Sequence, residues 1–337
     1  MKPASSRAFT LLELLVAVTV TLVVAGLMLS VTSGVLNLWR RTQAGHTQAS
    51  TAKQVLDLLE QDLQSAVYRR DARRWLAADI IDSPAGLANH GWLATAIGPM
   101  RPAGGGSLLP LPPAGANNER LLMSARFGLS GSWLRFITTN VESGGSLPVL
   151  VAYQMIRRPV TGDPLASNAS PVRYSLYRSA ISNTDTFTVG YDVTSSGYAS
   201  TTNNPTSASS TAYRAARNVM NPSHANVLAS NVVDFGCWLY GRNPDGTLLR
   251  IYPAGPGDTS HQAIGNSLAP DSRYPEVADV MVRVLTDAGA TQLEAIELGR
   301  IPSRPPAYAS DADWWWAVVE ANSRVFVRRI EIKGTPP

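Results

Sequence analysis

The sequence predicts an α+β protein, in which a long N-terminal helix packs against a domain built on an antiparallel β-sheet. The segment from Phe9 to Leu38 is mostly apolar and contains one charged residue, Glu13. An amphipathic stretch with helical spacing of apolar residues follows it, up to Tyr68. The remainder contains repeated short runs of β-branched and aromatic residues bounded by turn residues. These patterns predict a helix followed by an α+β domain.

The apolar segment is long enough to cross a membrane. A bilayer core takes about 20 apolar residues of helix, and a chain in lipid has to satisfy its own backbone hydrogen bonds, which favours a helix. Lys2 and Arg7 precede the segment and Arg40 and Arg41 follow it, so the distribution of positive charge does not fix its orientation. Because eight residues cannot form an exported domain, we expect the N-terminus in the cytoplasm and the larger part in the periplasm.

Glu13 makes this segment unusual. A carboxylate in the hydrocarbon region costs a few kcal/mol or more unless it has a partner. No basic residue lies close to it along the helix, since Arg7 is six residues away. We therefore expect Glu13 to be protonated or to pair with a group from outside its own helix. The alternative is a plain signal anchor with a stray acid.

The run Arg7-Ala8-Phe9-Thr10-Leu11-Leu12-Glu13 and the apolar residues after it resemble the class III signal of type IV pilins and type II secretion pseudopilins. The resemblance implies that a prepilin peptidase cuts between Ala8 and Phe9 and methylates the new amine. It implies a leader of residues 1–8 and a membrane and filament-core helix of residues 9–38. It also implies that Glu13 pairs with the N-terminal amine of a neighbouring subunit during assembly. The residue before the cut is usually Gly in this family, so Ala8 predicts slower cutting.

The helix is expected to continue beyond the membrane through residues 39–71. Apolar side chains fall on one stripe of this stretch, so we predict one continuous helix from about Phe9 to about Arg70; the alternative is a separate amphipathic helix. The stretch from Leu56 to Arg70 resembles the same region of J-type minor pseudopilins. Four arginines near the expected helix end either complement the helix dipole or form a partner-binding patch: Arg69, Arg70, Arg73 and Arg74.

Residues 72–337 are expected to form the α+β head. Residues 71–118 are irregular and rich in Pro and Gly, which indicates loops. Six later runs predict strands, with a turn at Asn243–Gly246 after the fourth: 133–139, 149–157, 172–178, 227–240, 277–285 and 325–332. Residues 194–212 and 253–275 are expected to be loops. The strand order also resembles that of J-type heads, and the whole chain resembles Verru_Chthon cassette proteins of type C.

A short helix capped by Ser310 is predicted through Val319. It contains Trp314, Trp315 and Trp316, which cannot all face one core because consecutive helical residues point about 100° apart. The triplet is either a candidate interaction surface or a large cluster spanning the core and its rim.

The remaining sequence argues against an enzyme. The motifs G-x-S-x-G, H-E-x-x-H and the P-loop Gly-Lys pair are absent. One cysteine, Cys237, excludes an internal disulfide. The four histidines show no ligand spacing and are expected at the surface or in loops: His46, His90, His224 and His261. No cofactor or metal is expected, although a calcium site built from distant loops stays open. The net charge of +4 is small and scattered, which disfavours nucleic acid as a partner.

Together these features predict a structural minor pilin or pseudopilin. It would join or cap a filament of a type II secretion or type IV pilus-like system in the inner membrane. Its expected partners are other pilin-like subunits, the prepilin peptidase, the assembly platform and the lipid bilayer. The alternatives are a minor pilin whose head binds DNA or a surface, and a membrane-anchored exported enzyme.

Overall fold

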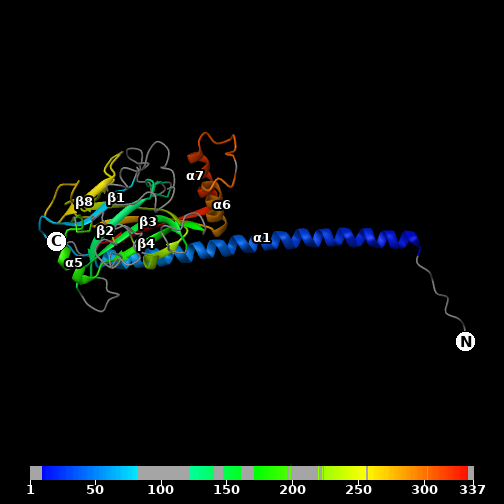
Figure 1. The fold of residues 1–337 in the computed structure, drawn as a ribbon, viewed down its shortest axis with the longest axis horizontal. Helices are drawn as coiled ribbons and strands as arrows, with labels where there is room; N and C mark the ends of the chain where they lie inside the picture. Colours follow the sequence, from blue (N-terminus) through cyan, green and yellow to red (C-terminus); the bar gives the residue numbers. More distant parts are fainter. Residues whose placement is uncertain are drawn as a thin grey trace, which may run out of the picture. The chain divides into compact units, whose positions relative to one another are not determined.

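The chain contains one long helix followed by two antiparallel sheets (Figure 1). The predicted α+β class is confirmed, with two sheets where the sequence predicts one. A computed structural model describes residues 10–81, 122–123, 125–139, 147–160, 171–195, 197–198, 219, 222, 224–255, 257–301 and 303–332. The chain divides into two compact units, residues 1–47 and residues 48–337. Helix α1, Leu11–Gln64, supplies the helical part of the first unit and continues into the second.

Helix α1 ends six residues earlier than the sequence suggests, at Gln64 rather than near Arg70. Ala66 forms a β-bridge with Thr138, and the Val67 N–H donates to the carbonyl of Ile137 at 2.9 Å. Helical propensity is a weak preference that such tertiary hydrogen bonds override. The arginines at 69–74 therefore do not lie in the last turn of the helix, which contains no basic residue.

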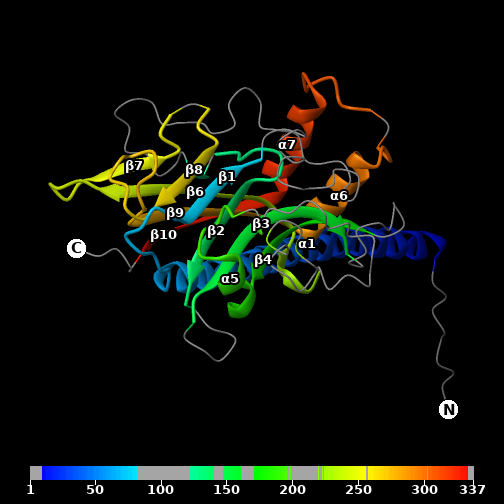
Figure 2. The same cartoon turned by 60° about the vertical axis from the view of Figure 1, so that its left-hand side comes forward.

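The second unit holds a six-stranded sheet with the order β5-β4-β3-β2-β1-β8 and a four-stranded sheet with the order β10-β9-β6-β7 (Figure 2). All strand pairs are antiparallel. The strands are β1 Arg74–Ile80, β2 Ser132–Thr138, β3 Val149–Pro159, β4 Val172–Ala180, β5 Val227–Ser230, β6 Val232–Arg242, β7 Leu248–Tyr252, β8 Ser260–Ile264, β9 Val277–Leu285 and β10 Ser323–Glu331. The shorter helical elements are α5 Asn183–Val189, η3 His224–Asn226, α6 Asp287–Glu297 and α7 Asp311–Asn322.

Five of the six predicted strands are confirmed as single strands, and one prediction is wrong. The run from Val227 to Tyr240 breaks at Asn231, whose φ of 61° lies in the left-handed region. Residues before the break pair with β4 in one sheet, and residues after it pair with β9 in the other. The chain therefore changes sheets at Asn231, which no periodicity of the run indicates.

Two regions expected to be loops contain strands. β1 lies within residues 71–118, and β8 lies within residues 253–275. The two strands pair with each other (Figure 2). Strand β7 and helices α5 and α6 also had no counterpart in the predictions. The predicted turn at Asn243–Gly246 is confirmed and joins β6 to β7, with a φ of 84° at Gly246.

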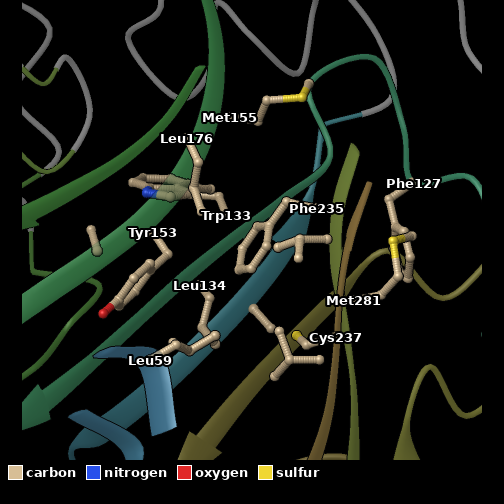
Figure 3. Packing of buried hydrophobic residues seen from close by; sticks show 14 of the residues in the cluster. Leu59, Phe127, Trp133, Leu134, Tyr153, Met155, Leu176, Phe235, Cys237 and Met281 are labelled. Atoms are coloured by element: carbon tan, nitrogen blue, oxygen red, sulfur yellow. The ribbon is translucent and has the colours of Figure 1, made fainter. Parts of the chain in front are cut away.

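The core of the second unit lies between the two sheets and the C-terminal part of α1 (Figure 3). Leu59 of α1, Leu134 of β2 and Phe235 of β6 are fully buried and belong to one continuous cluster. Tyr153 of β3 and Phe235 of β6 have ring centroids 6.4 Å apart, so side chains of the two sheets meet directly. The amphipathic pattern of residues 52–63 is thus explained by packing on the sheets.

Candidate functional site

The part of α1 from Leu11 to Leu36 has the composition of a membrane span. It holds 26 residues, its mean hydropathy reaches 2.6, and its side chains are not buried within the protein. The hydroxyls of Thr19 and Thr21 donate to backbone carbonyls of the preceding helical turn, at 2.8–3.0 Å. These polar side chains are therefore satisfied within the helix, as a lipid environment requires.

Glu13 has a hydrogen-bonding partner at the start of its own helix, Thr10, which the expectation from the sequence left out; its pairing with a group of a neighbouring subunit stays a prediction. Its Oε2 accepts hydrogen bonds from the Thr10 backbone N–H at 3.0 Å and the Thr10 hydroxyl at 3.1 Å. The Glu13 N–H donates to the Thr10 hydroxyl oxygen at 3.3 Å. This reciprocal arrangement is a capping box at the start of α1. The spacing T-x-x-E before an apolar run was the signal that could have revealed it.

Ala8 and Phe9, the predicted cleavage and methylation residues, lie outside the described residues. The capping box that begins at Thr10 follows them directly in the sequence. An amine created at Phe9 would therefore be covalently attached to the residue that holds the Glu13 carboxylate.

The predicted helix at the tryptophan triplet is confirmed as α7. Ser310 and Asp313 form a capping box, with the Asp313 N–H donating to the Ser310 hydroxyl oxygen at 3.1 Å. Trp315 and Trp316 are 3% and 2% exposed and therefore belong to the core, while Trp314 is partly buried against it. The core-and-rim alternative thus describes all three tryptophans, with Trp315 and Trp316 in the core and Trp314 at its rim; the use of Trp314 as an interaction surface stays a prediction.

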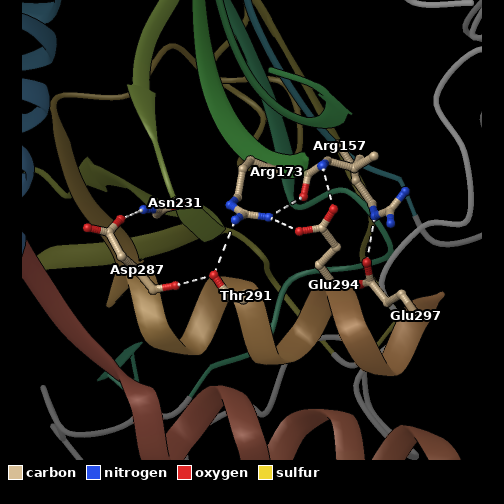
Figure 4. Close-up of polar contacts among 8 residues, drawn as sticks. Arg157, Arg173, Asn231, Asp287, Thr291, Glu294 and Glu297 are labelled. Carbon is tan, nitrogen blue, oxygen red and sulfur yellow. Dashed lines mark hydrogen bonds and ion pairs between the residues drawn. The ribbon is translucent and has the colours of Figure 1, made fainter. Parts of the chain in front are cut away.

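Helix α6 carries two glutamates whose oxygens are occupied by neighbouring groups (Figure 4). Glu297 accepts from Arg157 Nε at 2.7 Å, the Tyr174 hydroxyl at 2.6 Å and Trp315 Nε1 at 2.9 Å. Glu294 accepts from the Val172 N–H at 3.1 Å and pairs with Arg173. Burial raises the pKa of Glu294, but the hydrogen bonds from Arg173 and Val172 outweigh burial and lower it overall.

These two glutamates fix α6 and α7 to the six-stranded sheet, since their partners lie on β3, β4 and α7. Buried carboxylates with full hydrogen bonding hold structure and leave no oxygen free for proton transfer. We therefore assign this cluster a structural role.

A second buried ion pair connects the end of α1 to the same sheet. Asp62, which is fully buried, accepts from Arg178 Nε at 2.7 Å and Arg178 Nη2 at 3.0 Å. The hydroxyl of Tyr153 also donates to Asp62. A bidentate guanidinium–carboxylate pair has a defined geometry, so it fixes the position of α1 along β3 and β4.

Two side chains of types that often take part in chemistry, His261 and Cys237, are buried in the second unit. His261, expected at the surface, is instead 2% exposed, with Nε2 3.0 Å from the carbonyl oxygen of Arg273. Burial raises the pKa of Cys237 to about 12, which keeps its thiol protonated. Within the described ranges, no three His, Cys, Asp or Glu side chains form a group that could hold a metal ion.

Comparison with known proteins gives one match. Residues 3–29 match the family model described as the prokaryotic N-terminal methylation motif. No curated protein and no solved structure matches the chain. The matched residues include the capping box and most of the candidate membrane span. The N-terminal region is therefore prepilin-like, and its motif implies processing by a prepilin peptidase and assembly with other pilin subunits.

Proposed function

We propose that this chain is a structural minor pilin or pseudopilin, anchored in the inner membrane by residues 9–38 with its head in the periplasm. The observation that carries the proposal is the methylation motif over residues 3–29, placed at the start of an apolar helix whose first turn contains Glu13. A folded unit of residues 48–337 follows this helix. The resemblance of residues 56–70 to J-type minor pseudopilins supports a role in assembling or capping a secretion filament, and the Verru_Chthon type C resemblance supports a variant of that machinery.

A structural role also agrees with the hydrogen bonds and ion pairs that the buried carboxylates make within the folded unit. The buried carboxylates Asp62, Glu294 and Glu297 are bound to arginine, tyrosine or tryptophan side chains of the fold. We therefore propose that the head acts through its surface, without catalysis or a cofactor. The ligand-binding pilin and the anchored enzyme are the competing functions.

Glu13 acts in two ways under this proposal. In the separate subunit Thr10 holds its carboxylate, which reduces the cost of placing an acid near the lipid core. In a filament the same carboxylate attracts the amine of a neighbouring Phe9, because opposite charges attract strongly at low dielectric. The capping box thus presents the acid in a fixed position at the start of the helix.

Processing at Ala8–Phe9 tests the proposal directly. Intact-mass and N-terminal analysis of membrane-extracted protein should show a chain that begins with N-methylated Phe9. Co-expression with an inactive prepilin peptidase is the control and should leave residues 1–8 attached. A chain that keeps Met1 in cells with an active peptidase, or one cut after Leu38, contradicts the pilin proposal.

A further inference from the structure

Of the two roles that the sequence suggests for the arginines at positions 69–74, stabilisation of the helix end is wrong, and a partner-binding patch is left. A cation stabilises a helix when it lies in the last turn, but α1 ends at Gln64 and its last turn contains no basic residue. Arg69 and Arg70 instead lie on the irregular segment that joins α1 to β1. Stabilisation of the helix end therefore does not account for the positive charge of Arg69 and Arg70.

The backbone of this segment is held in place by neighbours far away in the sequence. Asn266 donates its N–H to the carbonyl of Asp71 at 3.0 Å, and Gly265 donates to the carbonyl of Arg73 at 3.1 Å. A Cβ added at Gly265 would lie 1.8 Å from the Arg69 carbonyl oxygen, so the two segments are in direct contact. Tyr68 stacks on Tyr274 with 4.2 Å between ring centroids. An irregular segment fixed in this way presents its side chains with little further loss of entropy on binding.

The side chains of the segment place positive charge at the surface. Arg69 and Arg70 are exposed, with Arg70 also hydrogen-bonded to the Tyr68 side chain, and the Arg73 side chain is 53% exposed. Asp71 accepts from the Arg73 N–H at 3.0 Å and from Trp75 Nε1 at 2.8 Å, so its carboxylate mainly stabilises the local conformation of the segment. Across the described residues, Arg69 has no carboxylate partner within 4.0 Å.

Two more arginines lie next to the segment and share one carboxylate. Glu276 is 3.6 Å from Arg242 Nε and 3.2 Å from Arg273 Nη2. Arg273 directly precedes Tyr274, whose ring stacks on Tyr68 of the segment, and Arg273 also donates to the carbonyl of Arg242. We call Arg69, Arg70, Arg73, Arg242 and Arg273 the arginine surface. These arginines outnumber the carboxylates that pair with them, Asp71 and Glu276.

We propose that the arginine surface docks an acidic segment of a different subunit in the filament. The inference rests on the proposed function, because it takes the partner to be a neighbouring pilin-like chain. Guanidinium groups bind carboxylates in paired hydrogen bonds, so acidic side chains are the matching chemistry. No two acidic residues are adjacent anywhere in this sequence, so a second copy offers no acidic run to match.

A nucleic acid fits the arginine surface less well than a polypeptide. Proteins that bind single strands stack bases on exposed aromatic rings, but Tyr68 and Tyr274 are stacked on each other. The surface also presents few cations, while tight backbone binding of nucleic acid uses many phosphate contacts. The surface therefore favours a short acidic stretch of protein.

Binding of defined anionic probes tests the chemistry. The full chain in detergent is titrated with a labelled oligoglutamate peptide and with a single-stranded oligodeoxynucleotide of equal charge, followed by fluorescence anisotropy. We expect the peptide to bind, and the R69E/R70E double variant to bind it at least about tenfold more weakly, since two charge-assisted contacts are lost. The control variant R300E/R324E changes two exposed arginines elsewhere on the same unit and should bind the peptide like the wild type. Equal loss in the control, or an oligodeoxynucleotide bound more tightly than the peptide through Arg69 and Arg70, overturns the proposal.

Crosslinking in cells then identifies the partner. A photoreactive amino acid in place of Arg70 should give adducts with acidic peptides of another pilin-like subunit, and the same probe at Arg324 should not. Adducts only with copies of this chain, or none, overturn the docking inference. If the docking inference fails but the chain is cut before Phe9, the proposed pilin function still stands. An uncut chain contradicts both the pilin function and the docking inference.

Discussion

At the scale of single residues, Glu13 has a local role in the first turn of its helix and, under the proposed function, a second role in assembly. Its carboxylate closes the first turn of α1 through Thr10. In the proposed filament, the same carboxylate pairs with the N-terminal amine of a neighbouring subunit. Since the cap depends on hydrogen bonding and the amine contact on charge, substitutions can separate the two.

Variants at positions 10 and 13 should therefore divide into two groups. Glu13→Gln keeps a residue that serves in capping boxes and removes the charge, while Glu13→Ala removes both. Crosslinking to partner subunits should fall in both, and membrane insertion should be at least as good as in the wild type because the costly acid is gone.

Thr10→Ala should lose about 0.5–2 kcal/mol of helix stability but keep the charge of Glu13. Thr10→Ser should restore the helix stability. Hydrogen exchange over the first turn and crosslinking yield are the measurements; normal crosslinking in both Glu13 variants would show that the acid is dispensable.

His261 should make the stability of the head depend on pH. Burial lowers its pKa from the ordinary value of 6.5, so it stays neutral in the folded protein. Below about pH 6.5 the unfolded chain binds a proton that the folded chain does not, so the free energy of unfolding falls as the pH falls. The free energy of unfolding falls by at most about 1.4 kcal/mol per pH unit. It stops falling once the pH is below the pKa of His261 in the folded protein.

Urea unfolding of residues 41–337, called here the head fragment, at several pH values between 7.5 and 5 measures this effect. His261→Gln should flatten the dependence, and substitution of the exposed His46 by Gln is the matched control. An unchanged slope in His261→Gln would assign the pH dependence to other groups.

At the scale of elements, buried ion pairs decide where helices attach to the sheets. Asp62 and Arg178 connect α1 to β4, and Glu297 and Arg157 connect α6 to β3. Arg328 also pairs with Asp57 and Glu60 of α1, but its side chain is 27% exposed. Exposed pairs contribute little, while breaking a buried pair leaves an unpaired charge inside the protein.

Asp62→Asn should destabilise the head by about 3–5 kcal/mol, because the buried Arg178 guanidinium loses its counter-charge. Arg328→Met, the matched control, should cost less than about 1 kcal/mol. Both values come from urea unfolding of the head fragment. Equal losses in the two variants would mean that burial does not set the strength of these connections.

At the scale of the whole molecule, the two units differ in their surfaces. In the first unit, the described side chains from Leu11 to Leu36 are exposed and almost entirely apolar. In the second, apolar side chains of the strands and of residues 52–63 fill a common core. The boundary at residue 47 coincides with Gln48, whose Nε2 donates to the Val284 carbonyl at 2.8 Å and which is buried.

A fragment that begins at Arg41 should therefore be a soluble, folded protein. Size-exclusion chromatography and far-UV circular dichroism without detergent should show a discrete species with mixed helix and strand content. The full chain is the control and should require detergent. A fragment that aggregates or stays in micelles would contradict the single-span topology.

The sequence by itself determined the features that depend on neighbouring residues. These include the apolar N-terminal helix, the amphipathic stripe of residues 52–63, five single strands and the Ser310 cap of α7. Each follows from composition or spacing within a few residues, where propensity, periodicity and capping act.

Only the tertiary structure decided the features that depend on distant partners. The end of α1 at Gln64 depends on β2, and the existence of β1 and β8 depends on their pairing with each other. The change of sheets at Asn231 and the burial of His261 likewise depend on residues far along the chain. Long-range hydrogen bonds and burial outweigh local preferences of about 1 kcal/mol or less per residue, so no local pattern could reveal them.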